Sequence, residues 1–81
     1  MSDDSRPPEL SFERLHRQYI ERYRPQGEIE RRAVDQAARE GYRLRTEATP
    51  EGREAALESL LQTAERISRL QRERRERSRK R

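Results

Sequence analysis

The large apolar residues in the second half of this chain recur at alternating spacings of three and four residues. This is the a/d spacing of a helix that packs along a seam, as in a coiled coil. The pattern predicts a long amphipathic helix and an all-α fold, because two shorter helical segments precede it. The seam is either the intramolecular core of a three-helix fold or a face for an oligomer or partner, and the two are compatible; we expect it to serve as an interface. Its members are Leu57, Leu60, Leu61, Ala64, Ile67 and Leu70.

The beginning of this helix is marked by Thr49 and Pro50. Threonine is a favourable N-cap, and proline is tolerated at the first helical position because its missing N–H has no partner there. The predicted helix spans 50–81 and ends in a basic tail. From Pro50 to about Arg77, such a helix reaches on the order of 42 Å at 1.5 Å per residue. We therefore expect two short helices to cover only about its first half, with the last turns projecting into solvent unless a partner covers them.

A helical hairpin is predicted for residues 11–45. Ser11 is a candidate N-cap, and an apolar stripe follows it at Phe12, Leu15, Tyr19 and Tyr23. The segment 24–27 contains Pro and Gly, which end the first helix and permit a turn. Such a short connection makes the two helices antiparallel neighbours.

The second helix is expected to start at about Glu28 and to bury one stripe. Favourable i, i+4 ion pairs, Glu28 with Arg32 and Asp35 with Arg39, are predicted on the opposite face. Gly41 predicts a kink, an early end or a close helix contact. Residues 46–49 are interpreted as a linker and residues 1–10 as a disordered leader. The stripe consists of Ile29, Ala33, Val34, Ala37, Ala38, Tyr42 and Leu44.

Only 28% of the residues are hydrophobic and 44% are charged, against typical values of roughly 45–50% and about 25%. A core this small leaves a single domain near zero net stability, so we expect self-association or a helical protein partner.

The absence of cysteine excludes disulfides and thiolate metal sites. No apolar run approaches the roughly 20 residues needed to span a bilayer, and the polar, acidic start of the chain is unlike a secretory signal. A cytoplasmic location is the expectation.

Residues 69–81 carry eight positive and two negative side chains, whereas residues 1–68 carry 12 positive and 14 negative ones. A compact cationic arm binds nucleic acid through released counterions, without sequence specificity. An acidic protein surface is the alternative partner, and a solvated helix end the third interpretation. We expect Glu73 and Glu76 to pair with Arg77 and Arg72. The predicted nucleic-acid-binding residues are Arg69, Arg72, Arg74, Arg75, Arg77, Arg79, Lys80 and Arg81.

One segment, residues 23–45, resembles a stretch that recurs in short uncharacterised bacterial proteins. Its pattern is an aromatic residue, x-Pro, then Glu, Val and a small apolar residue before aromatic-Arg-Leu-Arg. The resemblance implies a helical unit with a proline-marked start and implies no activity. The family usually has Trp where this chain has Tyr42. The matching positions are Tyr23, Pro25, Glu30, Val34, Ala38, Tyr42, Arg43, Leu44 and Arg45.

The sequence shows no set of residues that predicts catalysis, a cofactor, a metal site or a small-molecule substrate. His16 stands alone, without a second His or a carboxylate cluster. Glu28 and Glu30 are two residues apart and point to different faces of a helix, so they are not acid/base partners. The three tyrosines could stack on bases, but their places on apolar stripes favour core packing.

Two functional hypotheses follow from these patterns. The first is a small nucleic-acid-associated accessory protein whose arm binds phosphates and whose long helix mediates assembly. The second is a protein–protein adaptor or assembly subunit that docks through the long helix and binds no nucleic acid.

Overall fold

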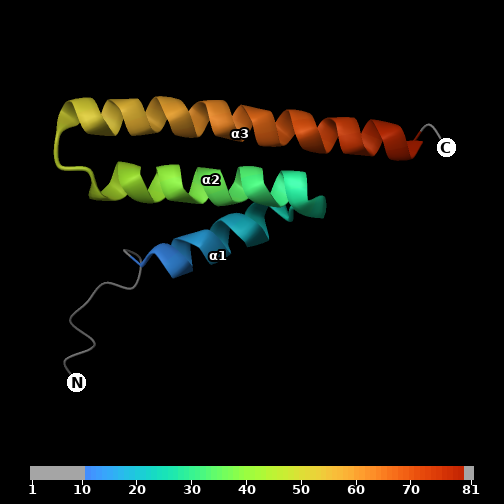
Figure 1. Ribbon diagram of the computed structural model, residues 1–81, viewed down its shortest axis with the longest axis horizontal. Helices are drawn as coiled ribbons and strands as arrows, with labels where there is room; N and C mark the ends of the chain where they lie inside the picture. The colour runs from blue at the N-terminus through green and yellow to red at the C-terminus, as the bar shows by residue number, and fades with distance from the viewer. Residues whose placement is uncertain (1–10, 80–81) are drawn as a thin grey trace, which may run out of the picture.

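The computed structural model describes residues 11–79, which form three helices: α1 (Phe12–Tyr23), α2 (Gly27–Thr46) and α3 (Pro50–Arg79). This part of the chain contains no strand, so the all-α prediction is confirmed. The helices form a flat layer in which α2 lies in the middle and packs against both neighbours (Figure 1). The Cα positions extend over 55 × 33 × 15 Å. The predicted leader, Lys80 and Arg81 lie outside the described residues.

The turn between α1 and α2 places two residues at positive φ. Arg24 caps α1 in the left-handed region at φ 49°, and its N–H donates to the carbonyl oxygen of Ile20 at 2.8 Å. Gly27 has φ 82° at the first position of α2. Glycine adopts this conformation without the Cβ penalty that other residues carry, so the sequence meets the backbone demand at Gly27.

Replacing Gly27 with alanine is expected to lower the free energy of unfolding by about 1–2 kcal/mol, because L residues are strained at this φ. A Cβ built at Gly27 meets no atom within 4 Å, so the effect comes from the backbone alone. Urea unfolding of the two proteins measures the difference. D-alanine at the same position, introduced by chemical synthesis, should restore the stability. Equal stability of the Gly27→Ala variant would contradict the backbone argument.

The buried core is small and lies mainly on α2. Ala33, Val34 and Ala37 of α2 form one cluster with Ile67 of α3, and Ile67 and Val34 are 0% exposed. Tyr19, Ile20, Tyr23, Leu60 and Leu70 pack around this cluster. Alanines on α2 allow its neighbours to approach closely, because they add little bulk. α2 therefore lies at the centre of the layer and supplies most of its buried residues.

Gly41 marks a close helix contact, which was one of the three predicted outcomes. Gly41 is buried inside α2, and a Cβ there would clash with the hydroxyl of Tyr19 and lie 3.1 Å from its Cζ. Leu15, which is 2% exposed, is the buried residue of α1. The ring of Phe12 meets Tyr42 edge-on at a centroid distance of 5.6 Å. These contacts hold α1 against α2.

Of the two predicted N-caps, Thr49 makes the capping hydrogen bond and Ser11 does not. The Thr49 hydroxyl accepts a hydrogen bond from the Gly52 N–H at 3.0 Å, as the N-cap prediction requires. Ser11 occupies the N-cap position of α1, but its side chain makes no capping hydrogen bond.

Of the predicted ion pairs, Glu28–Arg32 forms at 2.9 Å, whereas Asp35 contacts His16 and not Arg39.

Two predictions about burial are wrong. The sequence predicts Ile29 on the buried stripe of the second helix, yet it is 65% exposed. α3 was expected to leave the other helices after its first half, but the turn before α2 and the first turn of α2 remain in contact with it as far as Arg74. The physical reason is that polar residues continue the seam beyond Leu70, as described below. The C-terminal end of α3 extends past α2 (Figure 1).

Among the described helices, none combines the length and the apolar character that crossing a bilayer demands.

Candidate nucleic-acid interface

The predicted arginine arm is part of one continuous helix. Arg69, Arg72, Arg75, Arg77 and Arg79 are exposed on α3, whereas Arg74 is half-buried. Arg72, Arg75 and Arg79 follow the spacing i, i+3, i+7, so they lie along one face of the helix. The remaining two members of the predicted set, Lys80 and Arg81, fall outside the described residues.

The two predicted ion pairs within the arm do not form. Neither Glu73 with Arg77 nor Glu76 with Arg72 comes within ion-pair distance in the described part of the chain. The exposed arginines of this region therefore retain more charge for a partner than the sequence suggested. Residues 66–79 contain seven arginines and two glutamates.

Arg74 is engaged inside the protein. Its Nε donates to Oε2 of Glu30 at 2.7 Å, and Glu30 is 5% exposed. The Gln26 N–H donates to the other carboxylate oxygen of Glu30 at 3.0 Å, and Gln71 Nε2 lies 3.4 Å from that oxygen. Gln71 Nε2 also donates to the carbonyl oxygen of Tyr23 at 2.6 Å. We call these five residues the Glu30 network; it joins the end of α1, the turn, α2 and α3.

The Glu30 network fixes the ionisation of its carboxylate. Burial raises the pKa of Glu30, but hydrogen bonds from the Gln26 N–H, Arg74 and Gln71, together with the charge of Arg74, outweigh burial and lower the pKa below 4.5. A carboxylate that stays ionised keeps Arg74 in place. The sequence analysis does not predict this network. The available signal is that Gln71 and Arg74 occupy the next seam positions after Leu70, where a polar side chain indicates a buried polar partner.

A shallow hollow of about 430 Å³ lies beside Arg74 at the end of the layer. Three arginine side chains and a hydroxyl surround it, and the turn before α2 closes one side. Such a set of donors, with no carboxylate among the lining residues, suits a phosphate or carboxylate oxygen. The lining residues are Gln26, Arg74, Arg75, Ser78 and Arg79.

The predicted apolar seam divides into a buried and an exposed part. Ile67 is fully buried, and Leu60 and Leu70 pack against the core cluster. Leu57 and Leu61 are 43% and 61% exposed. One side of the seam therefore belongs to the intramolecular core. The other side, Leu57 and Leu61, is an apolar strip exposed on the surface of the described residues.

A groove of about 300 Å³ lies beside this strip, between α1 and α3. Tyr19 and Tyr23 form part of its α1 wall, and burial raises the pKa of the Tyr19 hydroxyl, with the charge of Tyr23 adding to the effect. The tyrosines pack at the edge of the core, as their stripe indicated. We name this hollow the α1–α3 groove; it is lined by Leu15, Gln18, Tyr19, Arg22, Tyr23, Arg45, Leu60, Leu61 and Ala64.

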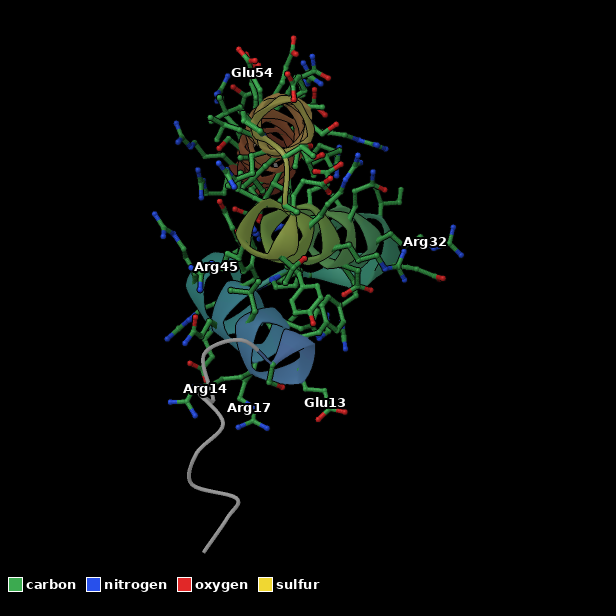
Figure 2. All side chains as sticks on the ribbon, turned by 90° about the vertical axis from the view of Figure 1, so that its left-hand side faces the viewer. Glu13, Arg14, Arg17, Arg32, Arg45 and Glu54 are labelled. Carbon is green, nitrogen blue, oxygen red and sulfur yellow. The ribbon has the colours of Figure 1, made fainter. Side chains whose placement is uncertain are left out.

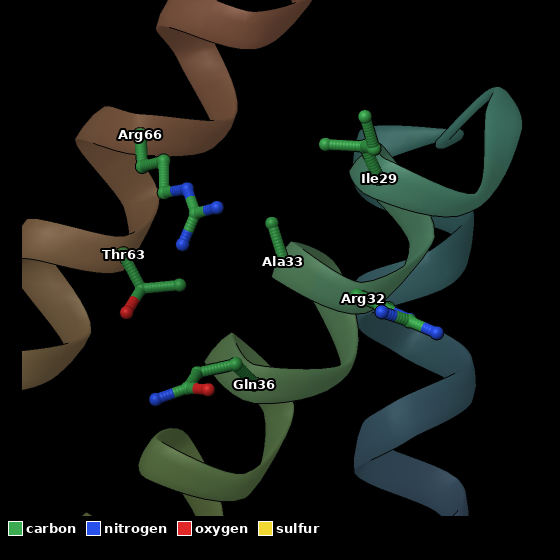
Figure 3. A pocket seen from close by; sticks show the side chains of 6 residues that line it. All are labelled: Ile29, Arg32, Ala33, Gln36, Thr63 and Arg66. Carbon is green, nitrogen blue, oxygen red and sulfur yellow. The ribbon is translucent and has the colours of Figure 1, made fainter.

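The opposite side of the layer has a more polar hollow of about 330 Å³ between α2 and α3 (Figure 3). Arg32, Gln36, Thr63 and Arg66 line it together with Ile29 and Ala33. It contains neither a carboxylate nor a histidine, so it lacks the groups for acid/base chemistry.

His16 takes part in the contact between α1 and α2. Its Nε2 lies 2.5 Å from Oδ1 of Asp35, and its ring stacks on Phe12 at 5.7 Å. Within residues 11–79, no group of three or more metal-ligating side chains comes together. His16 therefore acts as a packing residue with one polar partner.

Comparisons with known proteins give no relative from which a role could be transferred. No family model matches the chain, and neither a curated protein nor a solved structure matches it. The resemblance of residues 23–45 to short bacterial helical proteins stays a prediction.

Proposed function

We propose that this protein is a small nucleic-acid-associated accessory protein that binds the phosphate backbone through the arginine-rich end of α3. The helical hairpin of α1 and α2 supports this arm through the Glu30 network. The observation that carries the proposal is the separation of charge along one helix: residues 50–65 hold four glutamates and one arginine, and residues 66–79 hold seven arginines and two glutamates.

The arm is suited to polyanions for a physical reason. Each phosphate neutralised by an arginine releases condensed counterions, so several contacts made together give substantial, salt-dependent affinity. Arg72, Arg75 and Arg79 lie on one face, and the hollow beside Arg74 adds Ser78 and Gln26. Glu30 orients Arg74 through Nε, and Arg74 is one of the residues that line this hollow.

Charge substitution is the appropriate test, because deleting the arm would remove core and network residues. Truncation after Ser68 would take away Leu70, Gln71 and Arg74, which hold α3 against the other helices. Binding and folding would then be lost together. Substitutions at exposed arginines separate the two.

The triple variant Arg72→Gln/Arg75→Gln/Arg79→Gln is expected to bind nucleic acid roughly 10- to 100-fold more weakly at low salt. The slope of log K against log salt should fall by about 3, one for each lost phosphate contact. Fluorescence anisotropy with a short labelled duplex and a single strand, over a series of salt concentrations, measures both.

A matched control is the variant Arg14→Gln/Arg17→Gln/Arg39→Gln, which makes the same change in net charge at exposed positions on α1 and α2. We expect it to retain most of the affinity and the slope. Equal weakening by the two triple variants, or no salt-dependent binding of the wild-type protein to DNA or RNA, would refute the proposal.

A second function is favoured by the exposed leucines. Leu61 lines the α1–α3 groove and Leu57 lies one helical turn before it on α3, and such an exposed apolar face is typical of helix docking. Under this alternative the protein is an adaptor or assembly subunit, and the arm contacts an acidic protein surface. A wild-type protein that binds a protein partner and no nucleic acid would favour the adaptor.

A further inference from the structure

The α1–α3 groove and the exposed leucines belong to one continuous surface. Leu61 lines the groove and is itself 61% exposed, and Leu57 lies one helical turn before it on the same face. Tyr19, Tyr23 and Leu60 line the floor and walls. A partner helix that laid two leucines into this groove would cover apolar side chains on both sides.

Positive side chains line the groove, whereas negative side chains accompany the exposed leucines of α3. Arg22 of α1 and Arg45 of α2 line the groove, and no carboxylate does. On α3, by contrast, three exposed glutamates accompany the leucines: Glu54, Glu58 and Glu65. Their spacings of three or four residues from Leu57 or Leu61 place them on the same side of the helix.

Glu54, the first of these glutamates, lies on the outer side of the layer (Figure 2). In the view along the helices, Glu54 lies on the far side of α3 from α2, and Arg45 points to one side of the layer, opposite Arg32 (Figure 2). The groove is thus basic and apolar, and the segment 54–65 of the same molecule is acidic and apolar. Each is the complement of the other.

We propose that the occupant of the α1–α3 groove is the segment 54–65 of a second copy of this chain. The two α3 helices run antiparallel about a two-fold axis, with Leu57 and Leu61 of each copy in the groove of the other. One contact then fills both grooves and closes as an isologous dimer. The glutamates of each α3 approach Arg22 and Arg45 of the other copy.

The small core supplies a further reason for this association. Of the seven buried apolar residues in the described chain, four are alanines. A monomer of this size buries little apolar surface, and covering the leucines in a dimer adds to it. This dimer goes beyond the proposed nucleic-acid binding, because it uses residues outside the arm.

The experiment measures solution mass by sedimentation equilibrium over a range of concentrations. We expect the wild-type protein to have the mass of two 9.8 kDa chains and the variant Leu57→Glu/Leu61→Glu to have the mass of one. Both substituted residues are exposed, and circular dichroism checks that the variant remains helical. Ile29→Glu, at an apolar residue that is 65% exposed outside the groove, is the matched control and should remain dimeric.

A charge reversal tests the proposed pairing itself. Arg22→Glu/Arg45→Glu should weaken dimerisation at least tenfold, and adding Glu54→Arg/Glu58→Arg should restore it. A monomeric wild-type protein at all concentrations, equal dissociation by Ile29→Glu, or no restoration by the second pair would overturn the dimer. Binding of a short oligonucleotide by each variant is measured in parallel, so failure of the dimer is distinguished from failure of nucleic-acid binding.

Discussion

Replacing Ile67 with alanine should lower the free energy of unfolding by about 2–5 kcal/mol. Ile67 is 0% exposed and is the residue of α3 in the buried cluster with Ala33, Val34 and Ala37. The neighbouring alanines have short side chains that cannot extend to fill the space left by the isoleucine. Because a domain of this size has only a few kcal/mol in total, this loss is sufficient to unfold much of the population.

The matched control is Ile29→Ala, which removes the same atoms from a side chain that is 65% exposed. A surface substitution of this kind changes stability by about 0.5 kcal/mol or less. Urea unfolding at equal protein concentrations compares the two, and Ile67→Val, expected to cost about 0.5–1.5 kcal/mol, remains measurable if the alanine variant does not fold. Equal effects at positions 67 and 29 would show that Ile67 is not in the core.

The second large effect is expected for Glu30→Ala, at about 2–4 kcal/mol. The substitution leaves the Gln26 N–H and the guanidinium of Arg74 without their acceptor in a part-buried site. Glu28→Ala is the control: Glu28 also pairs with an arginine, but at 73% side-chain exposure, and such i, i+4 pairs contribute about 0.3–0.5 kcal/mol. Thermal and urea unfolding of both variants give the comparison.

The pH dependence of this contribution has a definite sign. The pKa of Glu30 in the folded protein lies below 4.5, so the unfolded chain takes up the proton first. The stabilisation is present above the unfolded value and is lost as the pH falls through the folded value. The stability difference between wild type and Glu30→Gln should therefore shrink from pH 7 to about pH 3. A difference that stays constant would show that the charge of Glu30 contributes nothing.

Local signals in the sequence predicted the helical elements well. Thr49 and Pro50 mark the start of α3, and Pro25 and Gly27 mark the turn before α2, because capping and backbone conformation depend on a few neighbouring residues. The alternation of three- and four-residue spacings identified Ile67, which is the largest fully buried side chain of α3. These are short-range properties, and a single sequence contains them.

The errors concern contacts between segments far apart in the chain. Ile29 follows the apolar stripe of α2, but it borders hollows between α2 and α3 that no side chain fills, so it stays 65% exposed. The partner of Glu30 is 44 residues away, and nothing near Glu30 identifies Arg74. From the sequence alone, Arg74 is indistinguishable from the other arginines of the arm, because its neighbours carry the same charge. Its half-buried position depends on where α2 begins, which periodicity does not specify.

The Glu30 network has a consequence for how α3 slides along α2. The apolar seam nearly repeats after seven residues, since Leu60 would take the place of Ile67 after a shift of about 10 Å. Apolar packing alone distinguishes such registers weakly. In the shifted register, Ala64 and Ile67 would face Glu30 in place of Gln71 and Arg74, which would leave a buried carboxylate without donors. One glutamate therefore sets the register of the long helix, and with it the number of arginine-bearing turns that extend beyond the layer.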